Sequence, residues 1–175
     1  MPLSLDGRAE PLFPTAAVSE YLLFSPAAMS SDPYNLARFL KAQGPVYEGA
    51  LAEIRAGRKR SHWMWYVFPQ VAGLGHSPTS VHYAIGNTEE AEVYLAHPIL
   101  GPRLIECAEA VLQIKGRSPA EVFGSPDDMK LRSSATLFAA VSPEGSVFHR
   151  IIEKHFDDEP DARTIELIGK ARRGP

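Results

Sequence analysis

SHWMWYVFPQ, residues 61–70, carries four aromatic side chains within six positions, between a basic run and a proline. If the stretch is helical it is apolar on almost every side, and such a segment has to be surrounded by other helices. This predicts a central core segment. The Trp and Tyr rings also carry polar tips, and His62 and Gln70 add donors and acceptors at its ends. That mixture is typical of a small-molecule pocket. We expect a mixed outcome, with most rings in the core and one face lining a pocket.

Helix signals recur along the rest of the chain. Asp32-Pro33 has the form of an N-cap followed by proline at the first helical position. Ser118 and Ser125 also precede a proline, each with an acid three residues later, and Asn87 precedes Glu90 in the same way. Apolar residues recur at helical spacing in the ranges 46–54, 100–112 and 148–155. The sequence predicts a mainly α fold, a single compact multi-helix domain of short to medium amphipathic helices with little or no sheet.

The helix signals also suggest the domain organisation. They begin at residue 32, and no linker or internal repeat divides the chain after that point. Residues 32–172 are therefore predicted to form a single α-helical domain. Residues 1–31 are rich in proline and small residues without a sustained period, so we predict a loosely ordered N-terminal extension.

Composition excludes several classes of function. The 175 residues carry a net charge of −3, so no nucleic-acid partner is expected. The one concentrated basic run, 55–60, reads as a solvated helix end and loop, with anion binding as the alternative. The single Cys107 cannot form an internal disulfide, and its place in an apolar stripe predicts a buried, inert thiol.

The histidines and the apolar segments argue against two further features, a metal site and a membrane span. The six histidines lack the spacing of a metal site, so no metal is expected, and any cofactor stays unknown. No apolar run is long enough to span a membrane and no signal peptide is evident. We expect no membrane association and a cytoplasmic location.

A second candidate stretch opens the helix expected after Ser125. Asp127, Lys130 and Ser134 fall at i, i+3 and i+7, and hence on one face. One interpretation is a solvated face with a weak charge pair. The other is a buried polar network in which Asp127 stays ionised and Ser134 donates to a ligand.

The two stretches carry complementary groups, so we expect them to share a cavity. The candidate ligand-binding residues are His62, Trp63, Trp65, Gln70, Asp127, Lys130 and Ser134. His62 is the candidate general acid or base, because the ordinary pKa of a histidine lies near neutrality.

Three stretches together are similar to a known family. HWMWYVFPQ followed by GLG, YLAHPILGPRL, and FGSPDDMKLRSSATLF resemble the uncharacterised bacterial domain-of-unknown-function family 1810, whose members often carry the mistaken label calpastatin. The resemblance covers roughly residues 33–170 and implies a compact, mainly α-helical fold of about 140 residues. It does not imply a calpain inhibitor, because calpastatin is disordered and this chain is apolar and helical. It carries no catalytic residues over to this chain.

Two functions follow as hypotheses. The first is an uncharacterised cytoplasmic helical protein that binds, and in one version acts on, a polar ring-containing small molecule in an aromatic-walled pocket. The alternative is a non-enzymatic protein-interaction module. Whether the chain is an enzyme is left open by its sequence. Burial separates the two, since a concave site with a half-exposed tryptophan favours a ligand and a flat apolar patch favours a protein partner.

Overall fold

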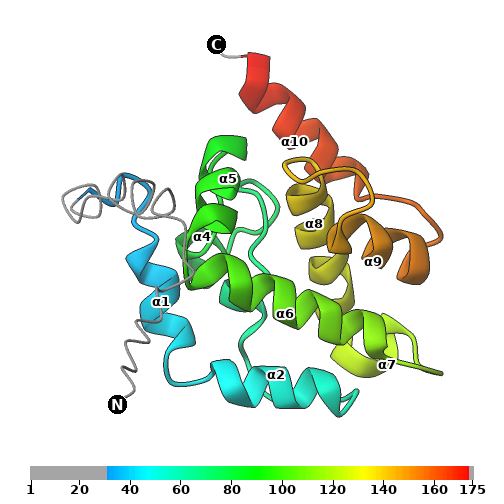
Figure 1. The fold of residues 1–175 in the computed structure, drawn as a ribbon. Helices are drawn as coiled ribbons and strands as arrows, with labels where there is room; N and C mark the ends of the chain where they lie inside the picture. Colours follow the sequence, from blue (N-terminus) through cyan, green and yellow to red (C-terminus); the bar gives the residue numbers. More distant parts are fainter. Residues whose placement is uncertain (1–30, 174–175) are drawn as a thin grey trace, which may run out of the picture. The chain divides into compact units, whose positions relative to one another are not determined.

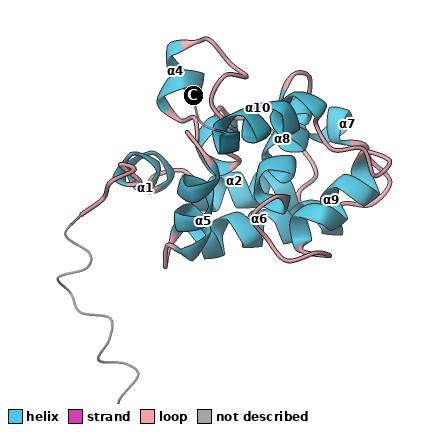
Figure 2. Cartoon of the chain, turned by 90° about the horizontal axis from the view of Figure 1, so that it is seen from above, coloured by secondary structure: helices cyan, strands magenta, loops and turns pink. Residues whose placement is uncertain are grey.

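The computed structural model describes residues 31–173, and the compact unit discussed below begins at Tyr34. This unit is built from helices (Figure 1), and Figure 2 shows them linked by loops. The mainly α prediction is confirmed. Over the described residues, extended pairing is limited to one isolated parallel bridge between Val71 and Ile85. Ten helices lie in this range: α1 (Ala37–Gln43), α2 (Tyr47–Arg55), α3 (Met64–Val67), α4 (Pro78–His82), α5 (Thr88–Ala96), α6 (Leu100–Gln113), α7 (Pro119–Phe123), α8 (Asp127–Ala139), α9 (Val147–His155) and α10 (Ala162–Arg173).

α6 is the longest helix, and α2, α5 and α9 pack against it. Its buried stripe includes Leu100, Leu104, Cys107 and Val111, as the apolar spacing predicts. Cys107 is fully buried, as expected. Burial, followed by the charge of Glu106, raises the pKa of its thiol to about 12. The thiol therefore stays protonated near neutral pH, which is the unreactive form.

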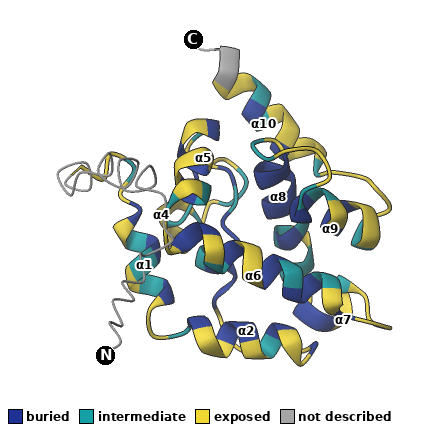
Figure 3. Cartoon of the chain, viewed as in Figure 1, coloured by how far each residue is buried: buried dark blue, intermediate teal, exposed yellow. Residues whose placement is uncertain are grey.

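α8 is buried on most sides, which Figure 3 shows as dark blue along much of its length. It packs against α7, α9 and α10 and also touches α3 and α5. In the centre, the Phe138 ring lies 5.5 Å from the rings of both Tyr94 and Phe148. Aromatic pairs at this spacing add to the apolar burial that stabilises the core.

The helix starts agree with the sequence in part. Ser118 forms the predicted capping box with Glu121. Asn87 accepts from the Glu90 backbone N–H at 2.8 Å, but the Glu90 carboxylate turns instead to the Gly86 N–H and to Arg38. Its 2.7 Å ion pair with Arg38 is almost fully buried and ties α1 to α5.

Two expected helix starts are wrong. Asp32-Pro33 does not begin α1, which starts at Ala37 after a turn in which Asn35 has φ 52°. Ser125 does not cap α8, whose N-cap position is Pro126. Main-chain carbonyls before the helix accept from two N–H groups of its first turn instead. Gly124 accepts from the Asp128 N–H at 3.0 Å and Pro126 from the Lys130 N–H at 3.2 Å.

The 61–70 stretch lies in the core but does not form a continuous helix. Only α3, a single turn, is helical, and Phe68 leaves the helix with φ −121° and ψ 72°. Pro69 explains this, because a proline disfavours helical geometry in the residue before it. The segment therefore leaves helical geometry at Phe68, and Trp63 and Trp65 differ in burial.

The domain boundaries stay predictions. The expected N-terminal extension, 1–31, lies outside the described residues except for Ser31. Within the described range, no helix is both long enough and apolar enough to cross a membrane.

Candidate functional site

A cluster of one acid and two bases joins the aromatic segment to the start of α8. The Asp127 carboxylate lies 2.7 Å from the Lys59 ammonium through one oxygen and 2.7 Å from the Lys130 ammonium through the other. The Lys59, Asp127 and Lys130 side chains are only 7, 16 and 19% exposed. The partnered network predicted for Asp127 and Lys130 is therefore present, with Lys59 as an unforeseen third member.

Two opposing effects set the protonation of Asp127. Burial acts to raise the pKa of this carboxyl, whereas the hydrogen bonds from Lys130 and Lys59 and the charges of the two ammonium groups lower it. The lowering effects win, so the pKa of Asp127 lies below its ordinary value and the carboxylate is ionised near neutral pH. An ionised Asp127 in turn holds the two lysines in place.

Each lysine also lies over a tryptophan of the segment. The Lys59 Nζ is 5.1 Å from the centre of the Trp63 ring, and the Lys130 Nζ is 4.3 Å from the centre of the Trp65 ring. An ammonium over an indole face is attracted by the negative face of the ring. The Lys130–Trp65 contact and the Lys59–Asp127 ion pair hold the 59–65 segment against α8, whereas the Lys59–Trp63 contact lies within the segment.

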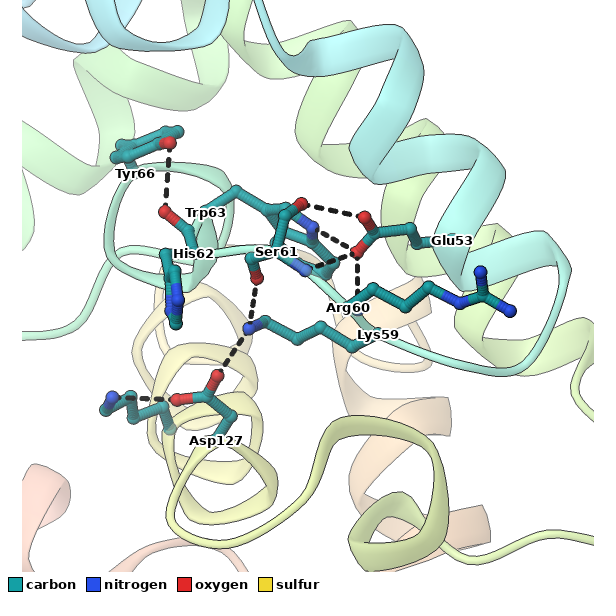
Figure 4. Close-up of polar contacts among 9 residues, drawn as sticks. Glu53, Lys59, Arg60, Ser61, His62, Trp63, Tyr66 and Asp127 are labelled. Carbon is teal, nitrogen blue, oxygen red and sulfur yellow. Dashed lines mark hydrogen bonds and ion pairs between the residues drawn. The ribbon is translucent and has the colours of Figure 1, made fainter.

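Glu53 of α2 anchors the other end of the segment (Figure 4). Its carboxylate accepts from the Arg60 N–H at 2.8 Å, from the Ser61 hydroxyl at 2.7 Å and N–H at 3.1 Å, and from the Trp63 indole N–H at 2.8 Å. Burial tends to raise the pKa of Glu53, but these hydrogen bonds lower it to about 2. The polar tip of Trp63 is thereby satisfied, which allows its ring to be buried.

A cleft of about 380 Å³ opens beside Lys130 and Trp65. Three segments form it: the aromatic segment with Gln70, the 74–80 loop with the start of α4, and the first half of α8. The residues that line it are Trp65, Gln70, Leu74, Gly75, His76, Ser77, Ser80, Pro126, Met129, Lys130 and Ser133.

The predicted site residues do not all line this cleft. Trp65, Gln70 and Lys130, which come from the two predicted stretches, line this cleft. Asp127 does not line it and acts through Lys130. Trp63 is 1% exposed, packs against Phe68 and Phe123, and belongs to the core. The aromatic stretch is therefore both core and pocket wall.

His62 and Ser134 lie elsewhere. His62 is exposed, its ring makes no hydrogen bond to any described residue, and it does not line the cleft. In Figure 4 its ring points to the same side of the segment as the Lys59 ammonium. The Ser134 hydroxyl is buried without a hydrogen-bond partner among the described side chains and backbone. Ser133 lines the cleft instead, because the open face of α8 follows Pro126, Met129 and Ser133.

Sequence reasoning missed two parts of the site. Lys59 belonged to a basic run that reads as solvated, and nothing local marks its distant partner. The serine pair of the 74–80 loop did carry a signal. Ser77 precedes Pro78 and caps α4, with its hydroxyl accepting from the Ser80 N–H at 3.1 Å. Ser118 precedes a proline in the same way, there with an acid at the third position after it.

The donor set of the cleft suits organic ligands. Its polar groups are an ammonium, an amide, an imidazole and hydroxyls, without a carboxylate. In the described part of the chain, no group of three or more His, Cys, Asp or Glu side chains is placed to hold a metal ion.

Residues 33–168, which include the whole cleft, match the model of the family described as "Protein of unknown function (DUF1810)". The chain belongs to this family. Among solved structures, the DUF1810 chain is similar to the crystal structure of the conserved hypothetical protein Rv1873 from Mycobacterium tuberculosis. The two are 51% identical with a TM-score of 0.78, over 79% of this chain and 99% of that one. A comparison with curated proteins finds no match. Neither description names an activity, so the function has to be argued from geometry.

Proposed function

We propose that this protein binds a small, polar, ring-containing molecule in the cleft between Trp65, Gln70 and Lys130. The supporting observation is that these three side chains, drawn from two distant stretches, line one concavity of about 380 Å³. That volume is in the range of small-molecule sites, which combine aromatic walls with a few placed polar groups. Trp65 supplies the aromatic surface for the ring, and Gln70 and Lys130 supply polar groups that orient it.

The charge of the cluster narrows the ligand. Two ammonium groups and one carboxylate leave one positive charge in excess beside the cleft. An ammonium has three N–H donors, and Lys130 uses one of them on Asp127. The Gln70 side chain has no hydrogen bond to any other described residue, so both ends of its amide are available. These groups favour a ring with acceptor atoms or a carboxylate substituent.

The proposal concerns binding, and no reaction is included. His62, the candidate general acid or base, does not line the cleft, so catalysis at His62 stays a prediction of the sequence. The cytoplasmic location also stays a prediction.

Saturation-transfer NMR with simple probes tests the proposal. We expect nicotinate and benzoate to show transfer from the protein and acetate, which lacks a ring, to show none. Trp65→Ala and Gln70→Ala should each weaken the signal. Gln113→Ala is the matched control, because Gln113 is exposed and lines a different cleft. Failure of both ring probes to bind at millimolar concentration, or equal binding to all variants, would contradict the proposal.

One observation favours the alternative, a protein-interaction module. A cleft of about 510 Å³ lies between α5, α6 and the start of α9. Its wall is mostly apolar, and Ile105 within it is 43% exposed. Self-association is the form of this alternative that the isolated protein can test. Light scattering over a concentration series would detect a dimer, and Ile105→Glu should abolish it if this surface forms the interface.

A further inference from the structure

We infer that the protein has a second binding site, for a small phosphate-bearing molecule, in an arginine-lined cleft at the end of α2. The cleft has a volume of about 420 Å³ and is lined by Ala52, Glu53, Ala56, Arg58, Arg60 and Arg117. It shares no lining residue with the cleft of Trp65 and Lys130. This inference therefore stands independently of the function proposed above.

Charge is the first argument. Three guanidinium groups and one carboxylate line the cleft, which leaves two positive charges in excess. Glu53 does not neutralise them directly, because its oxygens accept from the 60–61 backbone, the Ser61 hydroxyl and Trp63. The side chains of Arg58 and Arg60 have no hydrogen bond or ion pair with any residue that the structure describes.

Arg117 is partly occupied. One of its terminal nitrogens donates to the Gly57 carbonyl at 3.0 Å. Outside the cleft lining, hydrogen bonds from Ser118, together with the charge of Arg117, lower the pKa of Glu121. Counting Glu121, one positive charge is still in excess. A guanidinium has five N–H donors, so Arg117 keeps free donors for an anion.

The two loops that carry the arginines are fixed to each other. Besides the bond from Arg117 to Gly57, the Lys59 N–H donates to the Val122 carbonyl at 2.8 Å. Gly57 has φ +65°, a conformation that favours glycine, and lets the chain turn sharply after α2. Glu53 then holds the backbone of Arg60 and Ser61. The backbone positions of the three arginines are thus set before any ligand arrives, which lowers the entropic cost of binding.

Neighbouring side chains point in opposite directions at this loop. Figure 4 shows Lys59 reaching towards Asp127 and Arg60 reaching away from it. The ammonium of the buried Lys59 is neutralised by its ion pair with Asp127. The exposed Arg60 instead lines the arginine cleft. Within the basic run, Lys59 therefore has a structural role, whereas Arg58 and Arg60 remain available to a ligand. A loop that is merely solvated would not need this division.

Arginines that converge on one cleft recognise phosphate well. The guanidinium fork matches the geometry of phosphate oxygens and is weakly hydrated, so several arginines can bind one group by paired hydrogen bonds. The cleft is large enough for a phosphate and a small attached group. The net charge of −3 gives no extended basic field for nucleic acid. A small phosphate ester is therefore the ligand class that we infer.

Calorimetric titration at low salt with ribose 5-phosphate, inorganic phosphate and ribose tests the inference. Ribose 5-phosphate should bind, inorganic phosphate should bind more weakly, and ribose should not bind. Arg60→Gln and Arg117→Gln should each weaken binding about three- to tenfold, as expected for loss of a charge-assisted contact at an accessible site. Higher salt should weaken it further.

Arg55→Gln is the matched control. It removes the same charge from the same end of α2, where Arg55 makes an exposed ion pair with Glu106 and lies outside the cleft. If Arg55→Gln weakens ribose 5-phosphate binding equally, the effect is one of diffuse charge and the inference is overturned. Binding that is unchanged in Arg60→Gln and Arg117→Gln would also overturn it. A fluorescent single-stranded oligonucleotide is a further probe. Binding of the oligonucleotide through these arginines, without binding of ribose 5-phosphate, would also overturn it, in favour of nucleic acid.

Discussion

Trp63 and Trp65 are two residues apart in the same short segment, yet they lie in opposite environments. Trp63 is buried against Phe68 and Phe123, and its indole N–H is satisfied by Glu53. Trp65 is partly exposed, lies under the Lys130 ammonium and lines a cleft. The same residue type thus serves stability in one place and is available to a ligand in the other. What separates them is the partner of the polar tip and the direction in which the chain turns.

Replacing each tryptophan by alanine should break this comparison most strongly. Trp63→Ala should lower the free energy of unfolding by about 3–5 kcal/mol, the usual cost of a large core truncation. Trp65→Ala should cost about 1–2 kcal/mol, because a smaller apolar area and one cation–π contact are lost. Urea unfolding measures both. Similar costs for the two variants would show that Trp65 is also a core residue.

The sequence predicts the core side of this comparison better than the cleft side. Buried stripes such as Leu100, Leu104 and Cys107 follow from spacing alone, because helix periodicity determines which side chains share a face. Ser118 was identified from its local capping pattern. Each of these signals lies within a few residues of chain, so no tertiary knowledge is needed.

The cleft depends on information that is not local. Lys59 and Asp127 are far apart in the chain and meet only in the packed structure, where α3 contacts α8. Ser133 rather than Ser134 faces the cleft, and adjacent helix positions differ by about 100° around the axis. Spacing fixes the relative directions within α8 but not how the helix is rotated in the domain. Packing decides that rotation, so the sequence could place the site on α8 but not choose the correct serine.

The Glu53 carboxylate, which anchors the Trp63 side of the segment, sharpens the comparison. Glu53→Gln should lower the free energy of unfolding at neutral pH by about 1–3 kcal/mol, since charge-assisted hydrogen bonds to the Trp63 side of the segment are weakened. The pKa of Glu53 is lowered on folding from 4.5 to about 2. Its contribution is therefore fully present above about pH 4.5 and is lost as the pH falls towards 2.

Urea unfolding of the native protein and the Glu53→Gln variant between pH 7 and pH 2.5 measures this effect. The difference in unfolding free energy should narrow as the pH falls through that window. Glu121→Gln is the control, because Glu121 is exposed and serves one capping box. Its difference in unfolding free energy from the native protein should change less as the pH falls. A difference between native and Glu53→Gln that stays constant over this range would contradict the assigned role of the carboxylate.

Gln70→Ala should have the smallest effect on stability and the clearest effect on the cleft. The Gln70 side chain is partly exposed and has no hydrogen bond to another described residue, whereas its backbone carbonyl accepts from the Ile85 N–H at 2.8 Å. That backbone bond survives the substitution, so the free energy of unfolding should change by no more than about 0.5 kcal/mol. The amide that orients a ligand is nevertheless removed, and transfer to nicotinate in the NMR experiment should fall. A large loss of stability would place Gln70 with Trp63 on the core side of the segment. Unchanged stability with unchanged transfer would leave Trp65 as the group that a ligand contacts and would remove Gln70 from the proposed site.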